Sequence, residues 1–198
     1  MTLSNRKILR TLLCLLAGTL YAVCLSACDA KEPLSENRNA EIESPVIAND
    51  LSNQKVTAIA EDTQGHIWIG TFRGLNKNNV HDYHQYFCTD DSLGLPDNQI
   101  THLLRDSKNR FWVGTVNGVC LYTDKDNFRI IPIEADNKNV RQILEDRNGR
   151  IFLNTGFQLY AYHPREEKIT CVLPEISPGN AFYAQCHIAP DNNLWVMT

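Results

Sequence analysis

Three aspartates recur along the chain at nearly constant spacing and are the first candidates for acid–base chemistry. Asp62, Asp106 and Asp146 lie 44 and 40 residues apart. A catalytic carboxylate pair needs its two groups within about 5–10 Å of each other, whereas residues that occur once per repeat are distributed along an array. Each aspartate also begins an Asp-x-x-Gly or Asp-x-x-Asn tetrapeptide, which is typical of a type I β-turn. The pattern therefore predicts structural turns, and no catalytic residue is predicted.

Three tryptophans could form a stacking surface for sugar rings. Trp68, Trp112 and Trp195 each lie in a continuous apolar segment beside β-branched residues or leucine. Aromatic side chains supply much of the buried surface in repeated β-sheet folds. We therefore expect all three to pack between neighbouring sheets.

Two histidines are the first candidates for metal binding. His81 and His84 flank Asp82 and Tyr83. A strand directs side chains three residues apart to opposite faces, and no further group of ligands lies nearby in the sequence. Solvent-exposed edge residues are expected here, and no metal site is predicted.

Four cysteines follow the N-terminal segment, at Cys88, Cys120, Cys171 and Cys186. They show neither a Cys-x-x-Cys motif nor a regular spacing, so they do not predict a zinc site. Buried thiols are expected. A disulfide is the alternative, because an exported location permits disulfides. The sequence does not show which cysteines would pair.

Composition and missing motifs exclude further classes of protein. The 198 residues are 43% hydrophobic and 21% charged, close to a globular average, which argues against a disordered or polytopic membrane protein. Twenty-three acidic against 19 basic residues give a net charge of −4, which argues against nucleic acid as a partner. The chain contains no GxGxxG, GxxxxGK[ST], HExxH or GxSxG sequence. No cofactor is predicted.

The residues above belong to a repeat whose copies begin near residues 51, 95, 135 and 178. The first copy runs from Val56 to Thr71 and ends in Gly74-Leu75. The same positions recur 44 residues later at Ile100, Asp106, Asn109, Trp112, Gly114, Thr115 and Gly118. The third copy keeps Val140, Asp146, Gly149, Phe152 and Thr155, with Asn154 in place of a glycine. The fourth covers Cys186 to Thr198.

Each copy has the pattern of short antiparallel strands. In the first two copies we expect strands at 56–60, 66–71, 75–77 and 83–87, and at 100–104, 110–115, 119–122 and 128–131. Four short strands per period of about 40–45 residues indicate a propeller blade. Residues 51–198 are therefore predicted to be all-β, an incomplete β-propeller of about three and a half four-stranded antiparallel blades, where a closed ring needs at least about four. We expect the front portion of a longer receptor.

The repeat resembles the two-component regulator propeller family. The resemblance is carried by an Asp-x-x-Gly turn at Asp62 and Gly65, by Trp68-Ile69-Gly70-Thr71 and by Gly74-Leu75, with counterparts in the second copy. The third and fourth copies depart from it at Phe152, Asn154, Ala189 and Met197. The resemblance implies the periplasmic sensor region of a hybrid two-component histidine kinase and response regulator, often in bacteria that sense and degrade complex glycans. The kinase parts of such proteins are not in this sequence.

The N-terminus has the pattern of an export signal. Arg6, Lys7 and Arg10 precede an apolar stretch from Thr11 to Leu25 that is short for a spanning helix. Leu25-Ser-Ala-Cys28 resembles the lipobox of bacterial lipoproteins and makes Cys28 the predicted lipid attachment site. Cleavage near Ala30 and an uncleaved membrane anchor stay open as alternatives. Residues 1–28 are thus assigned to a signal peptide or anchor helix, and the charged residues 29–50 to a flexible linker.

These observations favour an exported, non-catalytic sensor segment at the periplasmic face of a bacterial membrane. Its expected partners are a small-molecule or oligosaccharide ligand, the remaining blades or downstream receptor domains, and the membrane through the N-terminus. Candidate ligand loops are 72–73, 116–117 and 93–99, without assignment of individual ligand-binding residues. The alternatives are a lipid-anchored interaction protein and a fragment of a propeller glycan lyase or hydrolase.

Overall fold

A computed structural model describes residues 45–89, 94–174 and 184–197, which belong to one compact unit, Ile42–Thr198. The predictions for residues 1–28, including Cys28, and for 29–44 lie outside the described residues. Within the described ranges, no helix has the length and apolar character needed to cross a membrane.

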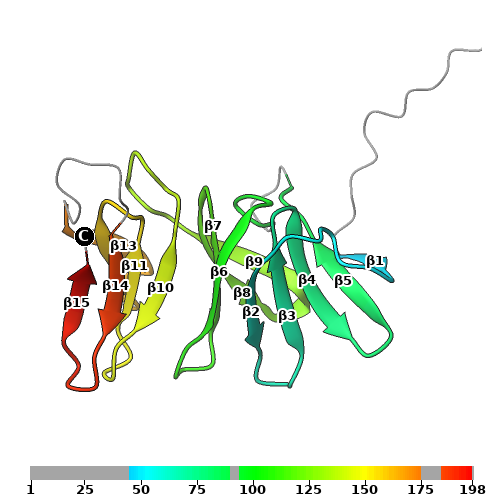
Figure 1. The fold of residues 1–198 in the computed structure, drawn as a ribbon, viewed down its shortest axis with the longest axis horizontal. Helices are drawn as coiled ribbons and strands as arrows, with labels where there is room; N and C mark the ends of the chain where they lie inside the picture. The colour runs from blue at the N-terminus through cyan, green and yellow to red at the C-terminus, as the bar shows by residue number, and fades with distance from the viewer. Residues whose placement is uncertain (1–44, 90–93, 175–183, 198) are drawn as a thin grey trace, which may run out of the picture. The chain divides into compact units, whose positions relative to one another are not determined.

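Four antiparallel sheets follow one another along the described part of the chain (Figure 1). We call them blades 1 to 4. Blade 1 contains β2 (Val56–Glu61), β3 (Ile67–Thr71), β4 (Gly74–Asn79) and β5 (Asp82–Tyr86). Blade 2 contains β6 (Ile100–Arg105), β7 (Phe111–Thr115), β8 (Gly118–Thr123) and β9 (Asn127–Ile131), with a short 3-10 helix η1 (Asp124–Asp126) before β9. Blade 3 contains β10 (Gln142–Glu145), β11 (Ile151–Asn154), β12 (Leu159–His163) and β13 (Lys168–Leu173), and blade 4 contains β14 (Gln185–Ile188) and β15 (Leu194–Met197).

The expected strands of the first two copies are confirmed, and each end lies within two residues of the expected position. Inside each blade the strands pair in chain order. The first strands of successive blades contact one another, β2 with β6, β6 with β10 and β10 with β14. These four strands are therefore the inner strands of the array, and β9 and β13 are the outer strands of the sheets of blades 2 and 3.

Residues 45–50 differ from the predicted flexible linker. Strand β1 (Val46–Ala48) pairs antiparallel with β5, in the register Val46↔Gln85 and Ala48↔Tyr83. The side chain of Ile47 stays 64% exposed. Backbone pairing with the open edge of β5 therefore forms this strand, a contribution that side-chain hydrophobicity does not reveal.

The predicted turns between the first two strands of each copy are confirmed. The amide of Gly65 donates to the carbonyl of Asp62 at 3.3 Å, and the next two copies repeat this bond from Asn109 and Gly149 at 2.9 Å. The residue that closes each turn has a positive φ, +85° at Gly65 and +61° at Asn109. Glycine and asparagine tolerate this left-handed conformation best, which accounts for both residue types at this position.

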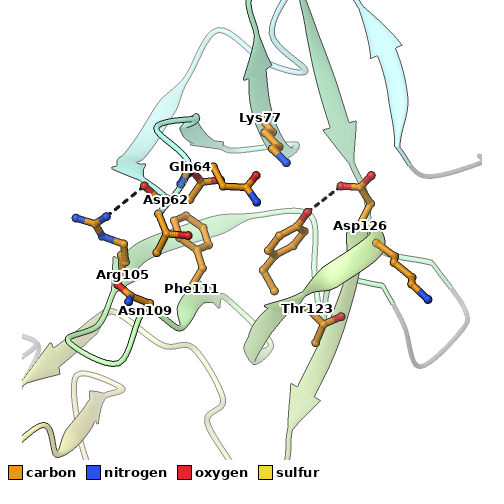
Figure 2. A pocket seen from close by; sticks show the side chains of 11 residues that line it. Asp62, Gln64, Lys77, Arg105, Asn109, Phe111, Thr123 and Asp126 are labelled. Carbon is orange, nitrogen blue, oxygen red and sulfur yellow. Dashed lines mark hydrogen bonds between the residues drawn. The ribbon is translucent and has the colours of Figure 1, made fainter.

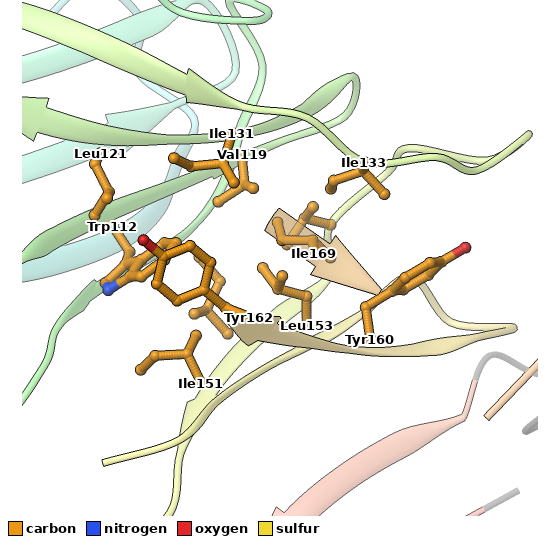
Figure 3. Packing of buried hydrophobic residues seen from close by; sticks show 12 residues of the cluster. Trp112, Val119, Leu121, Ile131, Ile133, Ile151, Leu153, Tyr160, Tyr162 and Ile169 are labelled. Atoms are coloured by element: carbon orange, nitrogen blue, oxygen red, sulfur yellow. The ribbon is translucent and has the colours of Figure 1, made fainter. Parts of the chain in front are cut away.

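Most of the hydrophobic core lies between the blades. The Trp68 ring of blade 1 lies 5.0 Å from Phe111 and 4.7 Å from Tyr122 of blade 2. Trp112 lies 4.8 Å from Tyr162 of blade 3, inside the cluster shown in Figure 3. The interblade role predicted for Trp68 and Trp112 is confirmed, because both are fully buried.

The same prediction is wrong for Trp195, which is 60% exposed. Its counterparts Trp68 and Trp112 are covered by the blade that follows them, and no sheet follows β15 among the described residues. At the other end of the array, Ile59 of β2 is 65% exposed, whereas the equivalent Leu103 is 7% exposed. The two end faces thus expose positions that the repeat buries elsewhere.

Close contact between blades explains the glycine of the Trp-Ile-Gly-Thr motif. A Cβ placed on Gly70 would meet Cγ2 of Ile100 in the next blade at 2.5 Å. In the third copy Asn154 occupies this position and is fully buried. We call the contact between two neighbouring blades a seam. At the seam between blades 3 and 4, the side-chain amide nitrogen of Asn154 donates to the carbonyl of Ala184 at 2.9 Å, so a hydrogen bond replaces the close approach.

The expectation of buried thiols holds for two of the four cysteines. Cys120 and Cys186 are buried and free. Cys88 and Cys171 are exposed, which corrects the prediction. Cys171 lies on β13, and Cys88 lies in the segment that follows β5. Cys120 and Cys186 belong to the buried hydrophobic clusters, whereas neither Cys88 nor Cys171 belongs to a cluster among the described residues.

Candidate functional site

Two of the three recurring aspartates link their turn to the tryptophan that packs between blades. Oδ2 of Asp62 accepts a hydrogen bond from Nε1 of Trp68 at 2.9 Å, and Oδ2 of Asp106 accepts one from Nε1 of Trp112 at 2.8 Å. We call each pair an Asp–Trp latch. The other carboxylate oxygen accepts backbone amides of its own turn, those of Gln64 and His66 at Asp62. The aspartates are therefore structural, as predicted.

Hydrogen bonding outweighs burial at Asp62 and Asp146. Burial raises the pKa of each carboxyl, but hydrogen bonds from Trp68 and two backbone amides hold the pKa of Asp62 below its ordinary value. Bonds from the amide and side chain of Arg150 do the same for the pKa of Asp146. Both groups are therefore ionised at neutral pH and act as acceptors.

A second side chain bonds each of these carboxylates, and its type differs between seams. In blade 2, Nε of Arg110 lies 2.6 Å from Oδ2 of Asp106, and its guanidinium lies 5.2 Å from the rings of Trp112 and Tyr162. In blade 3, Arg150 repeats the ion pair and lies 5.5 Å from the Phe152 ring. Blade 1 has His66 at this position, with Nδ1 3.1 Å from Oδ2 of Asp62.

A polar pocket of about 340 Å³ lies between blades 1 and 2, at the seam where histidine replaces arginine. We call it the seam pocket. Figure 2 shows Lys77 and Asp126 on one side, Arg105 and Asn109 on another, and Phe111 between them. The lining residues are Asp62, Thr63, Gln64, Lys77, Arg105, Asn109, Phe111, Tyr122, Thr123, Lys125 and Asp126.

Two tyrosines from neighbouring blades bond one carboxylate in the seam pocket. The hydroxyls of Tyr86 and Tyr122 donate to Oδ1 of Asp126 at 2.6 and 2.9 Å. Burial raises the pKa of Asp126, but these two hydrogen bonds and the charge of Lys77 lower it more, so the pKa lies below its ordinary value. Burial and the same carboxylate raise the pKa of both tyrosines, so their hydroxyls stay protonated donors.

A second pocket, of about 270 Å³, lies at the opposite ends of the inner strands. We call it the strand-start pocket. It is lined by Thr57, Gln99, Ile100, Thr101, Val116, Asn139 and Arg141. Side-chain acceptors order the loops that enter two of the inner strands, since the amides of Gln99 and Asn139 bond to Asp97 and Asn137. Among the described residues, no donor bonds the buried Oδ1 atom of Asn139, which leaves an acceptor for a ligand.

Two of the three predicted ligand loops contribute residues to the strand-start pocket. Gln99 and Val116, from the predicted loops 93–99 and 116–117, line it, and blade 3 adds Asn139 and Arg141, which sequence reasoning missed. Phe72 of the loop 72–73 packs instead under Lys55, whose Nζ lies 4.0 Å from the ring centroid. Leu93 lies outside the described residues.

The seam pocket also escaped sequence reasoning. The repeat alignment indicates a departure at Lys77, which lines this pocket and stands where the second copy has Leu121. At the histidine pair considered for metal binding, Nε2 of His84 lies 4.0 Å from Oδ1 of Asp82. In the part of the chain that the structure describes, no cluster of three or more histidine, cysteine, aspartate or glutamate side chains could hold a metal ion.

Four-stranded antiparallel sheets arranged in series, with inner strands in contact, define an all-β protein of the propeller class. The family model "Two component regulator propeller" matches residues 50–73 and 94–117. These segments cover the turn and Trp-x-Gly-Thr strand of blades 1 and 2, so the chain carries two-component regulator propeller repeats.

Solved structures show the same fold. The extracellular domain of the hybrid two component system BT4673 from B. thetaiotaomicron matches with a TM-score of 0.59 and 22% identity, over 72% of this chain and 19% of that chain. The corresponding domain of BT3049 gives 0.60 and 20%, over 75% and 21%. Virginiamycin B lyase from Staphylococcus aureus gives 0.56 and 20%, over 76% and 52%. The chain thus spans about a fifth of the two-component domains. No curated protein gives a significant match.

Proposed function

We propose that this chain is an exported, non-catalytic part of a ligand-sensing propeller in a two-component receptor. The observation that carries the proposal is the match of two-component regulator propeller repeats to blades 1 and 2. The likeness to extracellular domains of hybrid two-component systems supports it, although that likeness extends over about a fifth of those chains.

The strand-start pocket is the proposed sensing site. Loops and strands from three blades converge there, Thr57 from blade 1, Thr101 from blade 2 and Arg141 from blade 3. Hydroxyl, amide and guanidinium groups suit a ligand rich in hydroxyls, and no donor in the described part of the chain bonds the buried Oδ1 of Asn139. We assign this site to an oligosaccharide or another small polar ligand.

The proposed exported location rests on the N-terminal sequence. A lipid on Cys28 would hold the propeller at the periplasmic face of the membrane. Mass spectrometry of the mature protein tests this directly, because lipidation gives a modified chain beginning at Cys28. An unmodified chain beginning at Lys31 would contradict lipidation and leave export intact.

Further blades are the proposed partners of the two end faces. Ile59 and Trp195 are exposed, while their counterparts in the neighbouring repeats are buried against adjacent blades. Another blade of the same repeat would bury both in the same way. The substitution Ile59→Asp should then weaken association with such a blade, whereas a change at the solvent-facing Val80 should not.

A lyase is the second candidate, because virginiamycin B lyase has the same fold. The two functions differ in the fate of the ligand, which a sensor releases unchanged. The first test is a thermal-shift screen of the full chain with a broad oligosaccharide panel. The proposal predicts a saturable rise in melting temperature for at least one member. A folded protein whose melting temperature no member raises would contradict it.

A further inference from the structure

The last residue of each inner strand holds the same place in its blade. Glu61, Arg105, Glu145 and Ile188 each pair with the first residue of the strand that follows, as Arg105 does with Phe111. We call these four the strand-end residues. In blades 2 to 4 they lie at a seam with the preceding blade, and the hydrogen bonds of these seams show what this place recognises.

Two of the strand-end residues bond the turn of the preceding blade directly. Nη1 of Arg105 donates to the backbone carbonyl of Asp62 at 3.2 Å. The carboxylate oxygens of Glu145 accept the backbone amide of Ser107 at 3.0 and 2.8 Å, and the hydroxyl of Ser107 donates to the same carboxylate. A guanidinium only donates and a carboxylate only accepts, so each strand-end residue requires a different group of the turn that it meets.

The third seam bonds the same turn amide by another route. Ile188 has no polar side-chain atom, and Oδ1 of Asn192 in blade 4 accepts the amide of Arg147 at 2.8 Å. Ser107 and Arg147 are both the second residue of their turns, directly after the turn aspartate. The following blade therefore bonds the amide of the second turn residue at two of the three seams.

Blade 1 presents a carboxylate of this kind on its end face. Glu61 is exposed, and no hydrogen bond or ion pair engages its side chain within the described ranges. Beside it, Ile59 and Ile67 are 65% and 40% exposed, whereas the equivalent Leu103 and Phe111 are 7% and 4% exposed in the seam between blades 1 and 2. A blade packed on this face would bury both isoleucines and bring its turn to Glu61.

Blade 4 is a blade that cannot give Glu61 this bond. Its turn is closed as in the other blades, since the amide of Asn192 donates to the carbonyl of Ala189 at 2.9 Å. Its second turn residue is Pro190, which has no backbone N–H. If blade 4 of another molecule packed on blade 1, the Glu61 carboxylate would lose water without gaining this donor, which is unfavourable.

We propose that the end face of blade 1 selects a blade whose second turn residue offers a backbone N–H and a serine or threonine hydroxyl. Ile59 and Ile67 supply the contact area and Glu61 discriminates between blades, while Pro190 prevents blade 4 of another molecule from binding there. Penalising the wrong partner with an unpaired polar group is a general route to specificity. This selection rests on the proposed function, in which further blades cover the end faces.

The probe is this chain itself with Pro190→Ser, because the substitution gives blade 4 the residue type of Ser107. Sedimentation equilibrium of the full chain measures the self-association constant. Pro190→Ser should associate at least about tenfold more strongly than the wild type, the usual effect of gaining a hydrogen bond to a charged group. Pro190→Ala restores the amide without the hydroxyl and should give an intermediate constant.

Glu61→Ala, added to Pro190→Ser, should return self-association to the wild-type value. Glu166→Ala is the matched control, since Glu166 is an exposed acid in the turn between β12 and β13, and it should leave the stronger association unchanged. Melting curves verify that each variant is folded. Equal constants for the wild type and Pro190→Ser, or an association that Glu61→Ala does not weaken, would overturn the proposal.

Ile59→Asp separates failure of this selection from failure of the proposed function. Suppose that the wild type and Pro190→Ser associate equally and that Ile59→Asp abolishes both associations. The end face would then bind blades without selecting them, so the selection would fall and the proposed partners would stand. If Ile59→Asp leaves the association of Pro190→Ser unchanged, the end face is not the interface and both fall.

Discussion

Replacing Asp106 by alanine tests the structural role assigned to the recurring aspartates. This carboxylate is fully buried and bonds Nε of Arg110 at 2.6 Å and Nε1 of Trp112 at 2.8 Å. It also accepts the backbone amides of Lys108 and Arg110 at 3.0 and 2.8 Å. Asp106→Ala would leave a buried indole donor and a mostly covered guanidinium without an acceptor.

The expected loss in the free energy of unfolding is about 3–5 kcal/mol, the range for removing one partner of a buried ion pair. With a urea m value of about 2 kcal/mol/M, the unfolding midpoint should fall by roughly 2 M. The assay is urea unfolding of the full chain followed by tryptophan fluorescence, because Trp112 reports on the seam itself. A protein that no longer folds in water would agree with the expected loss.

The matched control is Asp191→Ala. Asp191 lies in the corresponding turn of the fourth copy, is exposed, and bonds only within its own turn, to Asn193. This variant should unfold at the wild-type midpoint. If Asp106→Ala also unfolded there, the latch would contribute nothing to stability and the reasoning would be refuted.

Three further predictions follow from single positions. Gly70→Val should destabilise the protein by at least about 1–3 kcal/mol in urea unfolding, because its Cβ would meet Ile100, and an unchanged midpoint would contradict this. The lowered pKa of Asp146 gives stability that is present above pH 3.8 and is lost as pH falls below it, so Asp146→Asn should flatten the acid limb of a stability–pH curve. A maleimide should label the exposed Cys171 in the native protein, while Cys120, whose burial raises its thiol pKa, should react only after unfolding.

Local features of the fold could be predicted from the sequence because the same residue pattern occurs in each copy of the repeat. The strand segments alternate or run apolar, and turn residues separate them, so the first two blades are correct to within a few residues. The turn aspartates were also recognised as structural, because a residue repeated around an array does not form a compact catalytic group.

Features that depend on contacts between neighbouring sheets could not be predicted from the sequence of one repeat. Trp195 lies in an apolar strand as Trp68 does, but Trp68 is covered by a following blade and Trp195 is not covered by one among the described residues. Strand β1 forms through backbone pairing with β5, and Cys171 is exposed because it lies outside the clusters that pack between the blades. The seam pocket is lined by residues of two blades, such as Lys77 of blade 1 and Arg105 of blade 2, which come together only when the blades are stacked.

The fate of a bound ligand tests the central claim of a non-catalytic sensing propeller most directly. A stabilising oligosaccharide from the thermal-shift screen would be titrated into the full chain by calorimetry and then recovered and analysed by chromatography. The account predicts saturable binding with the oligosaccharide recovered intact after prolonged incubation. Cleavage of the oligosaccharide by the purified wild-type chain would contradict the account and select the lyase.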